Sequence, residues 1–180
     1  MAVTIGVARE TAAGEARVAL TPETCRKFVA AGAAVQVETG LGAGAHFSDP
    51  DYADAGALIV ADARAALSDA ALVLCVRPPD AGRLQWVQPG AALVGVLQPE
   101  ADAARGQVIA ERRLLAFPLE RLPRTTRAQS MDVLSSQAGM AGYKAMLIGA
   151  QLAPRFFPVL TTAAGTIRPA RVLVIGAGVA

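Results

Sequence analysis

Short apolar runs alternate along the chain with stretches of helical pattern, and this alternation limits the fold more than any other feature. The runs cover residues 3–8, 35–38, 72–76, 92–97, 114–117 and 172–175. They are continuously apolar, which is typical of strands that helices cover on both faces. The pattern predicts a doubly wound α/β fold with a parallel sheet of the flavodoxin/Rossmann-like kind.

The first helix is marked at both ends. Thr21 suits the N-cap position, Pro22 suits the first helical position, and Gly32 stands where a left-handed residue is expected after the helix. Further helices are predicted near residues 50–55 and over residues 100–112. These helices would form the layers that cover the sheet.

A loop over residues 119–129 leads into a long helix, which is predicted over residues 130–152. Ser130 is the expected N-cap, and Asp132 then lies in the first turn, where a negative charge suits the helix dipole. A glycine in an exposed helix costs about 1 kcal/mol relative to alanine. Close packing against another element is therefore predicted at the glycines of this helix, which are Gly139, Gly142 and Gly149.

Residues 171–180 are interpreted as a buried strand running into the pattern G-x-G-x-x, with Gly176, Gly178 and Val179. In a dinucleotide-binding fold, the helix after such a turn points its N-terminus at the pyrophosphate. Without a sheet to join, this strand would expose its apolar side chains. The predicted organisation is an α/β domain over residues 1–129, a connecting helix over residues 130–153, and a linker with the start of a second, NAD-binding Rossmann domain over residues 154–180.

Composition narrows the possible functions. There are 17 Lys and Arg residues against 15 Asp and Glu, and aromatic residues make up 4% of the chain. Nucleic-acid binding favours a basic stripe with aromatic residues between the charges. No apolar run approaches the roughly 20 residues of a membrane helix, and Cys25 and Cys75 do not have metal-ligand spacing. We expect neither nucleic acid, nor metal, nor a membrane span in this chain.

Several segments carry a resemblance to a known family. Residues 4–10 read TIGVARE, residues 15–22 read EARVALTP, residues 40–44 read GLGAG and residues 54–57 read DAGA. Together they resemble the N-terminal domain shared by alanine dehydrogenase and the alpha subunit of nicotinamide nucleotide transhydrogenase. The resemblance extends over essentially the whole chain, and it leaves two kinds of relative to compare.

Alanine dehydrogenases resemble this chain at Arg17, which in that family grips the substrate carboxylate. They also carry a proton-handling histidine where Gln98 stands here. A glutamine does not exchange a proton near neutral pH, so it cannot replace a general acid or base. The single histidine, His46, lies in a different predicted loop. An alanine dehydrogenase-like amino-acid oxidoreductase is therefore the alternative and not the first expectation.

The transhydrogenase alpha subunit is the nearer resemblance, because residues 123–132, which read PRTTRAQSMD, are similar to that family's nicotinamide loop. The family's arginine, glutamine and aspartate in this loop correspond to Arg124, Gln129 and Asp132, which the resemblance implies as catalytic residues. It implies cofactor contacts at Arg124, Thr125, Thr126, Arg127, Gln129, Ser130, Met131, Asp132, Ser135, Gly176, Gly178 and Val179.

The residue types suit a nicotinamide. Its carboxamide has one acceptor oxygen and two donor hydrogens, so Arg124 can donate to the oxygen while Asp132 accepts from the nitrogen. Gln129 can both donate and accept, and it could reach a second nicotinamide. An alternative is that Arg124 and Asp132 form an ion pair that only secures the loop to the helix.

The resemblance implies a complete activity: the NAD(H)-binding component of a proton-translocating transhydrogenase passes hydride directly from NADH to NADP⁺. The NADP(H) is held by a partner component, and a further component spans the membrane. A homodimer is implied, located in the cytoplasm at the inner face of the membrane. Because the G-x-G pattern stops before its third glycine, another hypothesis is an inactive structural or dimerisation module.

Overall fold

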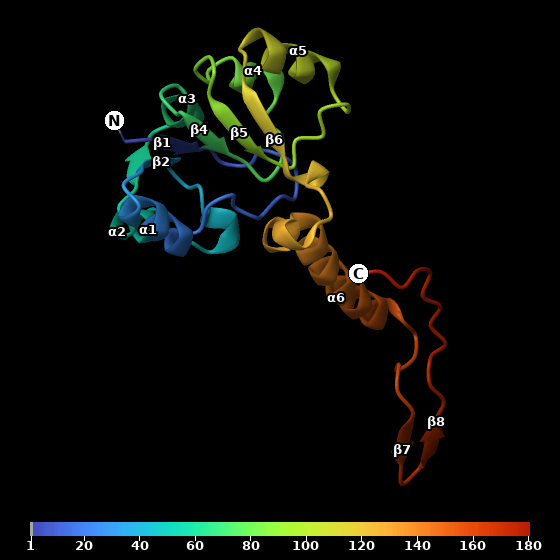
Figure 1. Cartoon of the computed structure of the whole chain (residues 1–180). Helices are drawn as coiled ribbons and strands as arrows, with labels where there is room; N and C mark the ends of the chain where they lie inside the picture. Colours follow the sequence, from blue (N-terminus) through green and yellow to red (C-terminus); the bar gives the residue numbers. More distant parts are fainter. Residues whose placement is uncertain (1) are drawn as a thin grey trace. The chain divides into compact units, whose positions relative to one another are not determined.

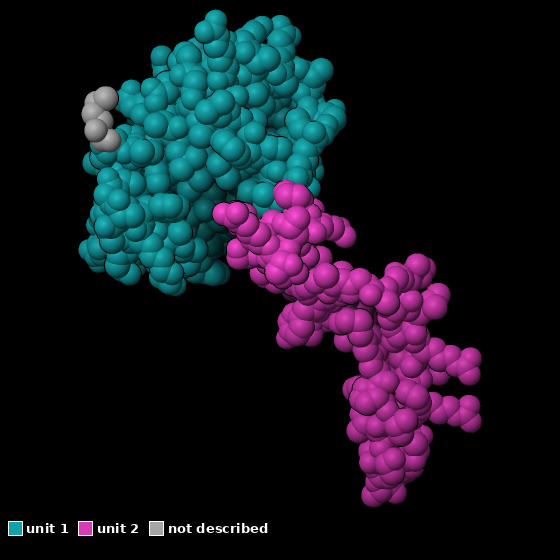
Figure 2. Space-filling view, viewed as in Figure 1, with its two compact units in different colours: residues 1–122 teal, residues 123–180 magenta. Residues whose placement is uncertain are grey.

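The computed structural model describes residues 2–180 and divides into two compact units. Unit 1 is Met1–Leu122 and unit 2 is Pro123–Ala180 (Figure 2). No helix of the described residues is both long and apolar enough to cross a membrane. Each unit has its own secondary structure.

Unit 1 is built on a six-stranded sheet whose neighbouring strands are all parallel. The strand order is β3-β2-β1-β4-β5-β6, and the strand order reverses between β1 and β4. This arrangement confirms the predicted doubly wound parallel sheet. The strands are β1 Thr4–Val7, β2 Ala34–Glu38, β3 Leu58–Val60, β4 Leu72–Leu74, β5 Ala92–Gly95 and β6 Leu115–Pro118.

The helices of unit 1 form two layers. Figure 1 shows α1 and α2 on one face of the sheet and α3, α4 and α5 on the other. Each layer closes over its own apolar cluster, one built around Val37 and Tyr52 and the other around Val73 and Leu93. The helices are α1 Pro22–Ala30, α2 Asp49–Asp54, α3 Ala63–Leu67, α4 Ala81–Leu84 and α5 Ala103–Glu111.

The caps of these helices follow local rules. The Thr21 hydroxyl accepts from the backbone N–H of Thr24, Pro22 opens α1, and Gly32 has a φ of +89°, as predicted. Ser48 and Asp51 form a reciprocal capping box at α2. The predicted helix over residues 100–112 begins later, because the Asp102 side chain caps α5.

Among the strands and α-helices of unit 1, three short ones were absent from the sequence prediction, namely β3, α3 and α4. Their lengths are three, five and four residues, too short for hydrophobic periodicity to distinguish strand from helix. The additional β3 places one more strand beyond β2. It extends a five-strand, flavodoxin-like order into the six-strand Rossmann order.

Unit 2 begins with the 3₁₀ helix η3, Thr126–Met131, and continues with helix α6, Val133–Leu152. The prediction of Ser130 as N-cap was wrong: Asp132 caps α6, because its carboxylate accepts from the backbone N–H of Ser135. Ser130 instead lies inside η3. No residue of α6 is fully buried.

The C-terminal part of unit 2 also differs from the prediction. The expected linker at the start of residues 154–180 contains an antiparallel hairpin of β7, Leu160–Thr162, and β8, Gly165–Ile167. Residues 172–175, predicted as a strand, form no strand and pair with no sheet. Their side chains are 52 to 92% exposed, as expected for an apolar segment without a partner sheet.

The glycines of α6 only partly follow their predicted packing. A Cβ at Gly142 would collide with the carbonyl of Ala180, and one at Gly149 would lie 3.7 Å from the Phe157 ring. A Cβ at Gly139 would meet no atom within 4 Å. Close packing therefore accounts for Gly142, whereas a side chain at Gly149 would make only an ordinary van der Waals contact, and the packing predicted at Gly139 was wrong.

Candidate functional site

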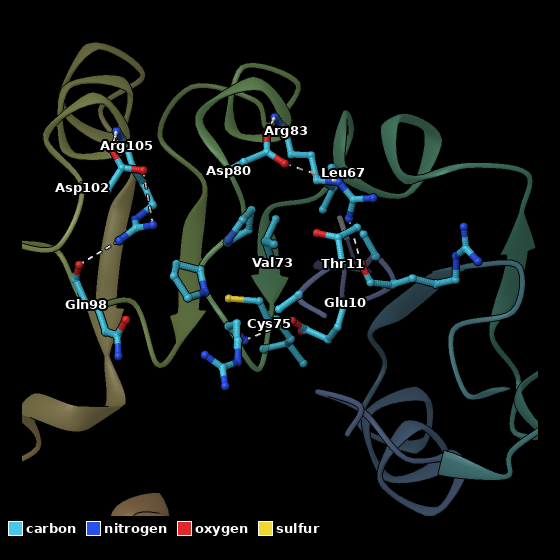
Figure 3. Close-up of a pocket in the computed structure, with 17 residues that line it drawn as sticks. Glu10, Thr11, Leu67, Val73, Cys75, Asp80, Arg83, Gln98, Asp102 and Arg105 are labelled. Atoms are coloured by element: carbon cyan, nitrogen blue, oxygen red, sulfur yellow. Dashed lines mark hydrogen bonds and ion pairs between the residues drawn. The ribbon is translucent and has the colours of Figure 1, made fainter. Parts of the chain in front are cut away.

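A cavity of about 280 Å³ lies at the carboxyl ends of β1, β4 and β5, where the strand order of unit 1 reverses (Figure 3). Ligands of open α/β sheets bind in this crevice. Its walls come from the segments that follow the three strands, including Glu10 after β1, Arg77 after β4 and Gln98 after β5. The geometry of unit 1 thus provides a small cavity at this place, with charged side chains among apolar ones in its walls.

Glu10 joins two of these segments across the sheet. Its carboxylate accepts from the backbone N–H groups of Val76, at 2.6 Å, and Arg77, at 3.1 Å. Burial raises the pKa of Glu10, while the two backbone hydrogen bonds oppose that rise. Because β1 and β4 are the strands that flank the switch point, Glu10 fixes the spacing of the two walls of the cavity.

The Glu15 carboxylate binds two arginine side chains beside the cavity. Its carboxylate accepts from Arg17 Nε at 2.7 Å and Nη2 at 2.6 Å, and from Arg77 Nε at 3.0 Å. The hydrogen bonds from Arg17, followed by those from Arg77, lower the pKa of Glu15 to about 2 despite opposing desolvation. The Arg17 guanidinium is therefore neutralised within the chain by a carboxylate that stays ionised near neutral pH.

Gln98 has an unusual backbone for a residue other than glycine, with a φ of +43°. Its N–H donates to Glu120 Oε1 at 2.5 Å, and its carbonyl accepts from Arg105 Nη2 at 2.9 Å. Figure 3 shows Arg105 extending toward Gln98 beside Asp102. The Arg105 side chain is 9% exposed, and its Nη1 lies 3.6 Å from Asp102 Oδ2.

Cys75 also lines the cavity, where its Sγ lies 3.5 Å from the Val94 carbonyl oxygen. Burial raises the pKa of this thiol to about 12, so it stays protonated and is a poor nucleophile near neutral pH. His46, in contrast, lines a different cavity with Phe47 and Asp51. The histidine is therefore not available to the cavity at the switch point.

The predicted nicotinamide loop lies in unit 2 and includes η3. Arg124 and Gln129 are exposed, while Ala128 between them is buried. The predicted contacts Thr125, Thr126, Arg127, Ser130 and Met131 are exposed too. The loop thus presents polar side chains outward on a short helical turn.

Asp132 is the most strongly fixed member of the predicted set. Its Oδ1 accepts from the Ser135 backbone N–H at 3.0 Å, and its Oδ2 accepts from the Ser135 hydroxyl at 2.6 Å. The Ser135 hydroxyl contributes most to lowering the pKa of Asp132, and the charge of Arg124 contributes in the same direction. Arg124 therefore lies within electrostatic range of Asp132. Among the described residues no ion pair joins the two, so the loop-securing pair is not formed.

At the G-x-G pattern, Gly176 has a φ of +100°, a conformation that favours glycine. Val179 is 64% exposed, and residues 171–180 form neither helix nor strand. The structure therefore does not form a pyrophosphate-binding strand–turn–helix at Gly176, Gly178 and Val179.

Sequence reasoning missed Glu10, Arg105 and Glu120. Glu10 and Glu120 contact backbone groups that are distant along the chain, by 66 residues for Glu10 to Val76 and 22 for Glu120 to Gln98, and Arg105 contacts the Gln98 carbonyl seven residues away. Only a weak signal was available, since Glu10 and Glu120 each follow shortly after a strand end. Parallel strands bring such positions to one edge of the sheet.

A parallel sheet of this order, with a cavity at its switch point, defines a doubly wound α/β domain of the Rossmann-like class. The model of the "Alanine dehydrogenase/PNT, N-terminal domain" family matches residues 6–141, and that of the "Alanine dehydrogenase/PNT, C-terminal domain" family matches residues 145–180. The chain belongs to the alanine dehydrogenase/PNT family, which confirms the resemblance found in the sequence.

The known relatives include both transhydrogenases and alanine dehydrogenases. An NAD(P) transhydrogenase alpha subunit of Rhodospirillum rubrum is 41% identical, over 98% of this chain and 47% of the relative. The crystal structure of a transhydrogenase from Sinorhizobium meliloti is 38% identical with a TM-score of 0.90, over 98% of this chain and 50% of that one. An L-alanine dehydrogenase structure is 31% identical with a TM-score of 0.75, over 83% and 40%. The chain spans about half the length of these relatives.

Proposed function

We propose that this chain belongs to the NAD(H)-binding component of a proton-translocating transhydrogenase. In this proposal hydride passes directly from NADH to NADP⁺ held by a partner component. The observation that carries it lies in unit 2, where Ser135 fixes an ionised Asp132 and Arg124 lies within electrostatic range of that carboxylate. Similarity to transhydrogenase alpha subunits supports the same assignment.

The side chains of the loop fit the nicotinamide end of NAD(H). Arg124 is exposed, and its guanidinium can donate to the carboxamide oxygen. Each Asp132 oxygen already accepts one hydrogen bond from Ser135, and a carboxylate oxygen has a second lone pair with which to accept from the carboxamide nitrogen. The exposed Gln129 can bridge to a neighbouring polar group. Asp132 and Arg124 together would select which ring face is presented.

When bound, NADH supplies the hydride, and no general acid or base is required of the chain. The residues of the chain serve to orient the nicotinamide ring, because hydride transfer needs the reacting carbons about 3–3.5 Å apart and correctly aligned. A carboxylate with a lowered pKa serves this role, since Asp132 stays an acceptor throughout the physiological range. Arg124 and Gln129 then act by holding the ring.

The wider assignment rests on the relatives and belongs to the same proposal. The α/β domain of residues 1–129 and the connecting segment of residues 130–153, which contains α6, would carry the loop. Residues 154–180 would lead into the Rossmann domain, with Gly176, Gly178 and Val179 at the pyrophosphate. We propose a homodimer that joins an NADP(H)-binding component and a membrane-spanning component. It would lie in the cytoplasm at the inner face of the membrane.

Two other functions compete with this one. Alanine dehydrogenase-like chemistry is disfavoured, because Gln98 cannot handle a proton and His46 lines a different cavity. A structural or dimerisation module has one observation in its favour. Helix α6 has no buried residue and exposes large apolar side chains, among them Met140, Tyr143 and Leu152.

Titration with NADH separates the enzyme component from the module. The full-length natural protein and the 180-residue chain are each titrated while NADH fluorescence is followed. The proposal expects micromolar binding by the full-length protein and much weaker binding by the short chain. If the full-length protein shows no binding at millimolar NADH, the module is favoured and the transhydrogenase assignment fails.

A further inference from the structure

Glu120 stands out among the groups of unit 1 to which the proposed function gives no role. It lies in the 3₁₀ helix η2, Leu119–Arg121, directly after β6. Its Oε2 accepts from the Leu97 N–H at 3.1 Å and its Oε1 from the Gln98 N–H at 2.5 Å. One half-buried carboxylate therefore binds two successive backbone amides beyond the end of β5.

The backbone of Gln98 is held from both sides. Glu120 accepts from its N–H, while its carbonyl accepts from Arg105 and from the backbone N–H of Ala101. A left-handed residue other than glycine is strained and persists only where its surroundings hold it. Successive N–H groups near such a residue form a concavity that favours an anion, and Glu120 supplies the anion.

The segment that joins η2 to the loop, Leu122 and Pro123, has restricted backbone angles. Leu122 has a φ of −57° and a ψ of +133°, the extended conformation expected of a residue before proline. Pro123 has its φ fixed by its ring. Glu120 and Arg124 are four residues apart, a span of at most about 14 Å. A displacement of η2 therefore also moves the residue from which the loop departs, because this short segment joins the two directly.

We infer that Glu120 is a positioning residue for hydride transfer: by clamping η2 to the end of β5, it fixes the point from which the nicotinamide loop of residues 124–132 departs. The inference rests on the proposed function of that loop. Misplacement by about 1 Å can slow a well-oriented reaction on the order of 100-fold. Loss of the clamp should therefore affect the transfer step more than the binding of NADH.

The test compares Glu120→Ala, Glu120→Gln and Arg121→Ala in the full-length protein. Arg121 is the matched control, because it joins the same 3₁₀ helix to the same turn through an exposed ion pair with Glu100. Glu120→Gln keeps one acceptor oxygen and so can satisfy only one of the two amides. Circular dichroism and the thermal midpoint establish that each variant is folded before it is compared.

The first measurement needs no cofactor. Amide hydrogen exchange of the free protein should be at least tenfold faster at residues 97–98 and 124–132 in Glu120→Ala, intermediate in Glu120→Gln, and unchanged in Arg121→Ala. Unchanged exchange over residues 124–132 in Glu120→Ala overturns the inference. That result is independent of whether the protein is a transhydrogenase.

The second measurement uses the assembled enzyme, with single-turnover hydride transfer and the Kd for NADH. Glu120→Ala should slow transfer tenfold or more and change the Kd less than threefold, while Arg121→Ala stays within twofold in both. Transfer within twofold of the wild-type rate would overturn the positioning role even where exchange is faster. If the wild-type protein itself does not bind NADH, the proposed function fails, and the exchange data alone decide the clamp.

Discussion

Asp132 and Ser135 share two hydrogen bonds, one from the Ser135 backbone N–H at 3.0 Å and one from its hydroxyl at 2.6 Å. The first caps helix α6, and both hold the carboxylate in one orientation. A residue that the sequence resemblance implies as catalytic is thus also the residue that starts the long helix. This double role can be separated, because asparagine caps a helix about as well as aspartate but carries no charge.

We predict that Asp132→Asn in the full-length protein slows hydride transfer at least tenfold and leaves the thermal midpoint nearly unchanged. Asp132→Ala should slow transfer and also lower the midpoint, because the cap is lost. Stopped-flow hydride transfer and circular dichroism measure the two effects. Unimpaired transfer in Asp132→Asn would remove Asp132 from the nicotinamide site.

The Glu15 carboxylate predicts a stability that depends on pH. Its pKa is about 2 in the folded chain against an ordinary value of 4.5, so it stabilises the fold above about pH 4.5 and loses this effect as the pH falls toward 2. We expect Glu15→Gln to lower the free energy of unfolding by about 1 kcal/mol at pH 7, since solvent at the half-exposed arginines screens the interaction.

The difference between wild type and Glu15→Gln should vanish between pH 4.5 and 2 in urea titrations. Glu23→Gln is the control, because Glu23 and its partner Lys27 are 75% and 70% exposed. Exposed pairs of this kind contribute little, so no change is expected from that substitution. A pH-independent loss in Glu15→Gln would show that packing, not ionisation, is responsible.

Tyr52 anchors the layer of α1 and α2. It is fully buried, and its hydroxyl donates to the Leu20 carbonyl at 2.7 Å. Tyr52→Phe leaves that buried carbonyl without its partner, so the free energy of unfolding should fall by about 1–2 kcal/mol. Tyr143, the other tyrosine, is 72% exposed, and Tyr143→Phe should leave stability unchanged in the same urea titration. Equal effects of the two substitutions would contradict the assignment.

Replacing Gly6 or Gly139 with alanine should change the stability of the fold in opposite directions. A Cβ at Gly6 in β1 would collide with the Ala66 carbonyl and lie 2.7 Å from the Ala70 Cβ, so Gly6→Ala should destabilise the chain by about 1–3 kcal/mol or more. Gly139 in α6 has open space, and Gly139→Ala should stabilise the helix by up to about 1 kcal/mol. Thermal midpoints report both, and a neutral Gly6→Ala would mean that α3 can move away from the sheet.

The elements of the structure that the sequence predicted depend on local chemistry. The Thr21 cap and the left-handed Gly32 follow from interactions within four residues, and the continuous apolar runs of five strands follow from burial on both faces. The same local reasoning misplaced the start of α6. Ser130 and Asp132 are both capping types, and only the 3₁₀ turn of η3 shows which one is used.

The doubly wound class of unit 1 and the family were predictable from the amino-acid sequence, which also carries the resemblance that marks the candidate nicotinamide loop. Tertiary structure decided the edge strand β3, the left-handed Gln98, and the carboxylates Glu10 and Glu120 that bind backbone amides across the sheet edge. The physical reason is the separation, along the chain, of the groups that interact. Caps and apolar runs are set by neighbours in the chain, whereas a carboxylate bound to amides 22 or 66 residues away exists only after parallel strands have brought their ends together.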